Sequence, residues 1–210
     1  MKFEIKISKK PVEYQDAIKF LEERVLKIQN KESSNLLWIL QHPNLYSAGT
    51  SAKEGDLLNK DQFPIYKTSR GGQWTFHGDG QKVIYFAIDL NLEKNIKKFV
   101  RNIENIIIQV LENYKIKSFN DPKNIGVWVS NNNNLEKIAA IGIRVKKWVA
   151  YHGFSININN DLEYFKKIIP CGVRDKRVVS LKDISKVKYT DFLRQLEKKL
   201  VKNLSVSNYS

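Results

Sequence analysis

The 210-residue chain contains a single cysteine, Cys171, which excludes an internal disulfide. A thiol without a partner fits a reducing compartment, so we expect a cytoplasmic protein. Long hydrophobic runs are also lacking, because the most apolar stretch after the opening, residues 103–111, is broken by Glu104 and Gln109. The first ten residues hold no continuous apolar segment either. We therefore expect neither a membrane span nor a signal peptide.

Repeats, low-complexity blocks and linker-like segments, which would separate domains, are absent from the sequence. Hydrophobic residues make up 42% of the chain, which is enough for a substantial core at this length. We therefore expect one monomeric domain over residues 1–210, with a loose tail over about 204–210.

Acidic residues are scarce beside basic ones: 22 Asp and Glu stand against 36 Lys and Arg, a net charge of +14. Such a field attracts acidic partners. The sequence has no zinc-knuckle spacing, no aromatic motif of the RNA-recognition type and no isolated arginine-rich arm, so nucleic acid is not the expected partner. An acidic protein is attracted equally, and solvated lysines from a compositional bias would give the same charge. Charge alone leaves the partner open.

Hydrophobic periodicity predicts alternating strands and helices along the chain. Residues 2–7 alternate, apolar residues recur at helical spacing over 17–28, and a loop is expected from residue 41 past Gly49. Strand 148–158 is expected to be interrupted at Gly153. The remaining predicted elements are strands over 36–40, 65–68, 83–88, 127–129 and 137–145, a helix over 96–111, a short helix after residue 160 and a last helix from residue 190.

A glycine-rich segment, residues 70–80, invites comparison with phosphate-binding loops. It lacks the G-x-x-x-x-G-K-[ST] pattern, and its Gly78-Asp79-Gly80 turn precedes a predicted strand, not a helix. Two interpretations remain. The glycines allow the backbone to approach a ligand, with Arg70 and His77 as polar contacts, or they form a wide turn between strands.

All three histidines, His42, His77 and His152, stand beside Pro or Gly at predicted strand ends. Side chains at such positions often line clefts. The alternative is that each imidazole satisfies a loop carbonyl. Neither H-x-E nor H-E-x-x-H spacing occurs, and Cys171 has no partner thiol, so we expect no metal site.

Cys171 lies between Pro170 and Gly172. A lone cysteine is more often a small buried apolar side chain than a nucleophile. An irregular turn with a nearby cation would instead lower its pKa and make it a thiolate nucleophile. Composition alone favours the first interpretation, whereas the local turn favours the second.

Four ordered segments resemble the octanoyltransferase family, whose members begin protein lipoylation. The segments are Arg70-Gly71-Gly72-Gln73-Trp74-Thr75-Phe76-His77-Gly78-Asp79-Gly80-Gln81, Lys137-Ile138-Ala139-Ala140-Ile141-Gly142-Ile143-Arg144, Tyr151-His152-Gly153-Phe154-Ser155-Ile156-Asn157 and Pro170-Cys171-Gly172. Two residues depart from the family pattern. Asp79 stands where the family usually has proline, and Trp74 is bulkier than the usual aliphatic residue, which affects the expected loop shape.

The resemblance implies an α+β fold, a mixed and mainly antiparallel sheet with packed helices, similar to the catalytic modules of lipoate and biotin protein ligases. It implies Cys171 as the nucleophile and Lys137 as its partner, with His42 and His152 in the pocket or just behind it. The substrate-binding residues that it implies are Arg70, Gly71, Gly72, Gln73, Trp74, Thr75, Phe76, His77, Ala140, Ile141, Gly142, Gly153, Phe154 and Ser155.

The implied reaction moves an octanoyl group from the phosphopantetheine arm of octanoyl acyl carrier protein, through a cysteine thioester, to a lysine of a lipoyl domain. The implied acceptors are the lipoyl domains of 2-oxoacid dehydrogenases and the glycine cleavage H protein, and no bound cofactor, ATP or metal is expected. Three other functions stay open: an ATP-dependent lipoate or biotin protein ligase, a basic nucleic-acid-binding protein, and a cysteine hydrolase.

Overall fold

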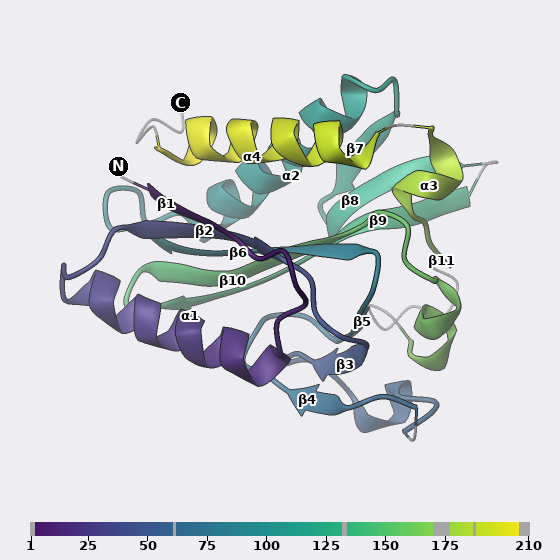
Figure 1. Cartoon of the computed structure of the whole chain (residues 1–210), viewed down its shortest axis with the longest axis horizontal. Helices are drawn as coiled ribbons and strands as arrows, with labels where there is room; N and C mark the ends of the chain where they lie inside the picture. Colours follow the sequence, from purple (N-terminus) through teal and green to yellow (C-terminus); the bar gives the residue numbers. More distant parts are fainter. Residues whose placement is uncertain (1–2, 61, 132–133, 170–176, 187, 206–210) are drawn as a thin grey trace.

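The computed structural model describes residues 3–60, 62–131, 134–169, 177–186 and 188–205. Within these ranges, eight strands form one twisted sheet, called here the large sheet (Figure 1). They are β1 (Phe3–Ile7), β2 (Asn35–Leu40), β6 (Gln81–Asp89), β7 (Ser118–Asp121), β8 (Asn124–Asn131), β9 (Asn134–Lys146), β10 (Val149–Asn157) and β11 (Arg177–Val178).

The strand order in the large sheet is β1-β2-β6-β10-β9-β8-β7, and β11 pairs with β9. β1 runs parallel to β2 and β11 runs parallel to β9, whereas the other neighbours are antiparallel. The expected mixed and mainly antiparallel sheet is therefore confirmed. β10 is paired with β6 along its whole length and with β9 from Val149 to Ile156, so the expected interruption at Gly153 is wrong.

A second, three-stranded sheet, called here the small sheet, consists of β3 (Leu45–Ala48), β4 (Ile65–Lys67) and β5 (Trp74–His77), with β3 in the middle. β3 lies inside the segment expected to be a loop, and β5 lies inside the glycine-rich segment. Each has only four residues, so neither carries a clear period in sequence. Their pairing with each other, from Leu45 opposite His77 to Ala48 opposite Trp74, stabilises both strands.

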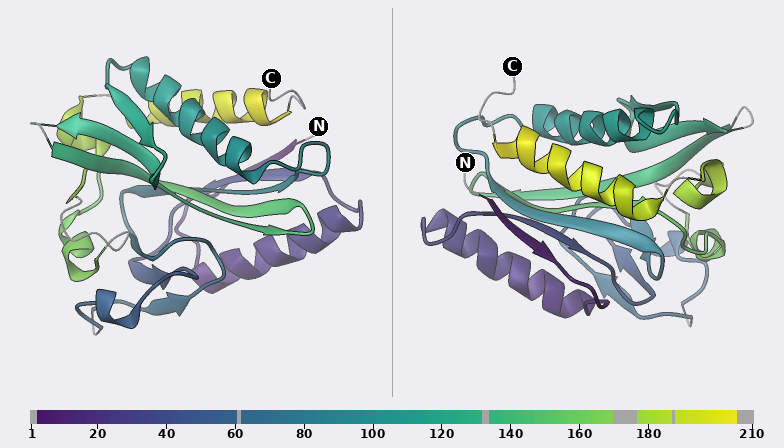
Figure 2. Two further views of the ribbon diagram at one scale, coloured as in Figure 1. Left: turned by 180° about the vertical axis from the view of Figure 1, so that it is seen from behind. Right: turned by 45° about the horizontal axis from the view of Figure 1, so that its top comes forward.

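Helices cover both faces of the large sheet (Figures 1 and 2). α1 (Tyr14–Gln29) lies on one face, and α2 (Ile96–Glu112) and α4 (Tyr189–Ser205) lie side by side on the other. The shorter helices are η1 (Glu54–Asp56), η2 (Glu163–Lys167) and α3 (Leu181–Ile184). α2 begins after Asn95, whose side chain accepts a hydrogen bond from the backbone N–H of Lys98, a standard N-cap.

The two long predicted helices form because apolar residues recur every three or four positions and are buried along one stripe of each helix. The stripe of α2 packs with the inner face of α4 and one face of the large sheet, forming the largest apolar core. The stripe of α1 packs on the opposite face, against residues of β2, β6 and β10.

The chain end differs from its prediction. α4 continues to Ser205, and the Leu204 side chain is 1% exposed because it packs into the core with α2. The expected loose tail was therefore placed too early, and residues 206–210 lie outside the described part. No helix within the described ranges combines the length and apolar character needed to cross a membrane.

Candidate active-site cavity

A cavity of about 450 Å³ is lined by residues of both sheets. This volume lies in the range of roughly 300–1,000 Å³ that is usual for small-molecule sites. The lining comes from residues 70–75 and 77, 83 and 85 of β6, 137–138 and 140–143 of β9, 152–155 and 157 of β10, 96 and 100 of α2, 123–125, and Ser51, Phe165 and Val178.

The structure brings together nearly all of the predicted site residues. Lys137, His152 and all but one of the predicted substrate-binding residues line the cavity, although their binding of a substrate stays a prediction. Phe76 is the exception. Its ring points away from the neighbouring Thr75 and His77, as alternation along a strand requires, and packs 5.0 Å from the Tyr164 ring and 5.6 Å from the Phe165 ring.

The glycine-rich segment is held in place by Arg70. Its guanidinium donates hydrogen bonds to the carbonyl oxygens of Ser47 at 2.8 Å, Gln73 at 2.7 Å and Gly71 at 3.0 Å. These bonds fasten the segment to β3, so Arg70 shapes the cavity wall as well as lining it.

The Gly71 backbone lies against β9 at Gly142. A Cβ atom on Gly142 would stand 2.9 Å from the Gly71 carbonyl oxygen, and a Cβ atom on Gly71 would stand 3.0 Å from the carbonyl oxygen of Ile143. The glycines therefore let one backbone approach another. This contact gives a physical reason for glycine at both positions that needs no ligand.

His42 does not line the cavity but supports it from behind Tyr85. Its Nδ1 lies 2.6 Å from the Val12 carbonyl oxygen, so Nδ1 carries the proton and donates it, and Nε2 accepts from the Tyr85 hydroxyl at 2.9 Å. Burial lowers the pKa of His42 to about 4, against the opposing effect of the Val12 carbonyl. The imidazole is therefore neutral at physiological pH.

His77 is fixed by a second hydrogen-bonded chain. Its Nδ1 donates to Gln81 Oε1 at 2.8 Å, and Gln81 Nε2 donates to the Phe76 carbonyl at 3.2 Å and to Asn157 Oδ1 at 2.9 Å. Burial, and then the neighbouring His42 and Arg70, lower the pKa of His77 well below its ordinary value. His77, which lines the cavity, is therefore a neutral imidazole.

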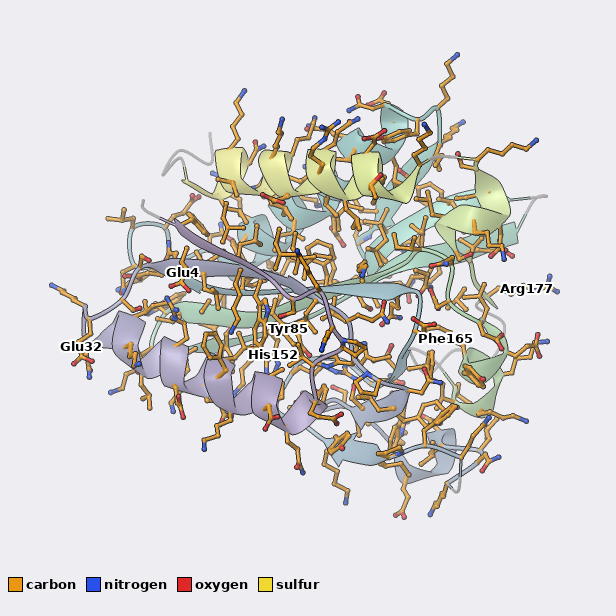
Figure 3. All side chains as sticks on the ribbon, viewed as in Figure 1. Glu4, Glu32, Tyr85, His152, Phe165 and Arg177 are labelled. Atoms are coloured by element: carbon orange, nitrogen blue, oxygen red, sulfur yellow. The ribbon has the colours of Figure 1, made fainter. Side chains whose placement is uncertain are left out.

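His152 has an unusual backbone for a strand residue. Its φ is +65°, in the left-handed region that residues other than glycine seldom adopt. Its ring stacks on Tyr151 and lies 6.4 Å from the Tyr85 ring, and Figure 3 labels both His152 and Tyr85 near the middle of the molecule. Burial, with Arg70 and Arg144 nearby, lowers the pKa of His152 to about 3. Within the described part of the chain, His152 Nδ1 is buried without a hydrogen-bond partner.

Lys137 is 6% exposed and lines the cavity from β9. Its Nζ donates a hydrogen bond to the Ile125 carbonyl at 3.0 Å and lies 4.6 Å from the centroid of the Trp128 ring. The strand register shifts beside it, between Val127 and Trp128. Such bulges interrupt the alternation of side chains and are common next to functional residues.

Cys171, predicted as the nucleophile, lies outside the described residues, as do its neighbours 170 and 172–176. The chain on their C-terminal side is described and is close to Lys137: Val178 stands opposite Lys137 in the parallel pairing of β11 with β9. Phe165 and Val178, which precede and follow this segment, both line the cavity.

Several residues at the cavity were not singled out from the sequence. Tyr85 lines the cavity, Gln81 and Asn157 fix His77, and Glu104 accepts a hydrogen bond from Gly126. Gln81 and Asn157 are the last residues of two motifs that carry the family resemblance. Their place in these motifs was the signal that could have identified them. For Glu104 the signal was its charge within an otherwise apolar helix stripe.

Comparison with known proteins decides the family. A family model described as the lipoyl protein ligase A/B catalytic domain matches residues 13–201. The chain belongs to this family. The octanoyltransferase of Ehrlichia chaffeensis is 41% identical to this chain over 210 residues, covering 99% of the chain and 97% of the relative. The predicted family membership and the predicted class of enzyme, an acyltransferase of the lipoyl and octanoyl type, are confirmed.

Solved structures confirm the fold of this chain. A bipartite lipoate protein ligase from Thermoplasma acidophilum has a TM-score of 0.74 at 12% identity, covering 97% of this chain and 85% of that one. A biotin protein ligase from Aquifex aeolicus has a TM-score of 0.54 at 14% identity, covering 97% of this chain and 69% of that one. The expected likeness to the ligase catalytic modules is therefore correct.

Proposed function

We propose that the chain transfers an octanoyl group from octanoyl acyl carrier protein, through a thioester on Cys171, to a lysine of a lipoyl domain. The observation that carries this proposal is the position of Lys137, a buried lysine on the wall of a cavity whose lining includes Ile138, Ile141 and Phe154. An apolar wall suits an acyl chain, and a lysine ammonium stabilises a thiolate. Membership of a family that includes octanoyltransferases supports the same reaction class.

In the first step, the Cys171 thiolate, paired with the Lys137 ammonium, attacks the thioester carbonyl of the donor. A bond forms between Cys171 Sγ and the acyl carbon, and the bond from that carbon to the phosphopantetheine sulfur breaks. The departing sulfur takes a proton from Lys137 and leaves as a thiol.

In the second step, the amine of the acceptor lysine attacks the Cys171 thioester. The amide C–N bond forms, the acyl–Sγ bond breaks, and the proton lost by the amine passes to Lys137. This restores the initial pair of thiolate and ammonium, so the cycle is balanced. Because the donor is already an activated thioester, the proposed reaction needs neither ATP nor a metal nor a bound cofactor.

The chain is long enough for Cys171 to meet Lys137. Cys171 precedes Arg177 by six residues, and six residues span at most about 21 Å. Arg177 and Val178 pair with Glu136 and Lys137. The length of this segment is therefore compatible with a contact between Cys171 and Lys137.

Partners follow from the same proposal. The bipartite lipoate protein ligase that shares this fold belongs to an archaeal lipoylation system with its own E2 lipoyl domain, which supports a lipoyl domain as acceptor here. We propose that the chain is a monomeric cytoplasmic enzyme. Its proposed acceptors are the lipoyl domains of 2-oxoacid dehydrogenases and the glycine cleavage H protein. With a net charge of +14, the chain would attract acidic donor and acceptor proteins at rates that fall with added salt.

Intact-protein mass spectrometry tests the proposal. The protein is mixed with octanoyl acyl carrier protein, and wild type is compared with Cys171→Ser, Lys137→Ala and a matched control, Lys146→Ala, which removes an exposed lysine from the same strand. Wild type and Lys146→Ala should gain one octanoyl group that hydroxylamine removes. Cys171→Ser should gain no hydroxylamine-labile group, and Lys137→Ala should load at least about 100-fold more slowly.

Two results would contradict the proposal. If Cys171→Ser still octanoylates a lipoyl domain, and only when ATP and free octanoate are supplied, the chain is an ATP-dependent ligase. Release of free octanoate without an acceptor would instead indicate a hydrolase.

A further inference from the structure

The peptide group between Ile125 and Gly126 contacts a charged side chain at each of its polar ends. The Ile125 carbonyl oxygen accepts a hydrogen bond from Lys137 Nζ at 3.0 Å, and the Gly126 N–H donates to Glu104 Oε1 at 2.9 Å. Carbonyl and N–H belong to one planar trans peptide, so they point in opposite directions. Glu104 and Lys137 therefore hold a single peptide plane from its two sides.

Glu104 comes from α2, where it is 5% exposed and stands beside the fully buried Ile103 and Ile107. Burial raises the pKa of its carboxyl, and the Gly126 N–H, Arg101 and Lys137 oppose that effect, whereas Asp121 adds to it. Burying a carboxylate costs free energy unless hydrogen bonds or cations compensate. An apolar residue would pack this stripe of α2 at lower cost, so the helix itself gives no reason for a glutamate here.

Gly126 is required by the same arrangement. Its φ is +132°, a conformation that strains any residue with a Cβ atom. An added Cβ would stand 2.6 Å from the Ala139 carbonyl oxygen and 3.2 Å from Lys137 Cε. The peptide thus lies directly against the aliphatic stem of the lysine.

We infer that Glu104 is a positioning residue, which holds the Lys137 ammonium at the cavity by fixing the peptide between Ile125 and Gly126. The inference rests on the role proposed above for Lys137. A carboxylate at the N–H end of a peptide polarises the group and strengthens the acceptor at its carbonyl end, because connected hydrogen bonds reinforce one another. Glu104 touches no reacting atom and acts on the reaction through its hold on Lys137.

Transfer kinetics with octanoyl acyl carrier protein and a lipoyl domain test the inference. In Glu104→Ala, kcat should fall roughly 10- to 100-fold, because small misplacements of a reacting group have effects of this size. The donor KM should stay within about twofold, because the acyl-binding wall is untouched. Glu104→Gln keeps an oxygen that accepts from Gly126 but loses the charge, so its kcat should lie between those of wild type and Glu104→Ala.

Two controls separate positioning from a loss of folding. Glu112→Gln removes an exposed carboxylate from the same helix and should leave kcat unchanged. Gly126→Ala should reproduce the kcat loss of Glu104→Ala without altering Glu104. Thermal unfolding of Glu104→Gln should occur no more than a few degrees below wild type, so a kcat loss in that variant reports on Lys137 and not on stability.

Amide exchange and lysine labelling test this inference without an activity assay, so its outcome can be separated from that of the proposed function. In Glu104→Ala the Gly126 amide should exchange with D2O about tenfold faster, and acetic anhydride should modify Lys137 faster relative to Lys146 in the same digest. If wild type transfers no octanoyl group while these changes appear, the proposed function fails and the positioning stands. If both the exchange at Gly126 and the labelling of Lys137 match wild type, or Glu104→Ala keeps full kcat, the inference is overturned.

Discussion

The two faces of the large sheet differ in the kinds of residues that they bury. Under α2 and α4 the sheet buries an almost uninterrupted apolar core, in which the rings of Phe86 and Phe99 meet edge to face. On the other face it buries a smaller apolar cluster under α1 and, beside that cluster, a group of polar residues. This group, called here the histidine cluster, consists of His42, His77, Gln81, Tyr85 and Asn157. The apolar core is held by area removed from water, and the histidine cluster by matched hydrogen bonds.

The two sides differ in how strictly each residue is constrained. An apolar core tolerates any residues of suitable volume, whereas each member of the histidine cluster is restricted by its hydrogen-bond partner and protonation state. Tyr85 and His77 belong to the cluster and also line the cavity. Buried polar residues whose donors and acceptors are matched give the cavity a wall of defined shape with neutral imidazoles.

Truncation in the apolar core should have the largest effect on stability. Phe99→Ala removes a ring that is 1% exposed, and such substitutions cost about 3–5 kcal/mol. Urea unfolding monitored by circular dichroism checks this value. The loss should be the same at pH 7 and pH 5.5, because the ring packs within a cluster of apolar residues. A loss that changes strongly with pH would break the contrast between the two sides.

Acid should destabilise the protein through the histidine cluster. The folded pKa of His42 is about 4 against an ordinary 6.5, so between these values the unfolded chain binds a proton that the folded chain does not. Stability therefore falls as the pH drops from 6.5, by on the order of 3 kcal/mol for this shift alone, since one pKa unit is worth about 1.4 kcal/mol.

Urea titrations at intervals from pH 7.5 to pH 5 measure this slope above the ordinary carboxyl range. His42→Gln, which removes the titrating ring, should have a smaller slope than wild type whatever its absolute stability. Equal slopes in the two proteins would show that His42 does not sense the pH.

Substitution at the cavity wall should have the smallest effect on stability and a clear effect on activity. In Gly142→Ala the new methyl group would press on the Gly71 carbonyl oxygen and on Arg70 Cδ at 3.3 Å. Overpacking of this kind costs about 1–3 kcal/mol. The displaced wall should slow octanoyl transfer more than about tenfold, because small misplacements of reacting groups have large effects on rate. Gly55→Ala is the matched control, because a Cβ atom there meets nothing within 4 Å.

Much of the fold was predictable because its signals are local. The apolar stripes of α1 and α2 and the apolar run of β2 repeat over enough residues to define their periods. β3 and β5 were not predicted as strands, because each has four residues and is stabilised by a partner that is far away in sequence. The cavity residues were found through the family motifs, because hydrophobic periodicity does not indicate which residues line a cavity.

Other features depended on register and contact, which no short pattern contains. The ring of Phe76 points away from the cavity although both neighbours line it, because a strand alternates its side chains. The left-handed backbone of His152 and the pairing of Glu104 with Gly126 arise from packing between distant segments.

The sequence by itself determined the long helices, most strands of the large sheet and the family, because hydrophobic spacing and motif order are properties of neighbouring residues. Only the tertiary structure decided which of the motif residues share a cavity and which tautomers the histidines take. It also decided that the Ile125–Gly126 peptide joins Glu104 to Lys137. These features depend on hydrogen bonds between groups that the sequence places far apart, and such bonds exist only once the sheets and helices have packed.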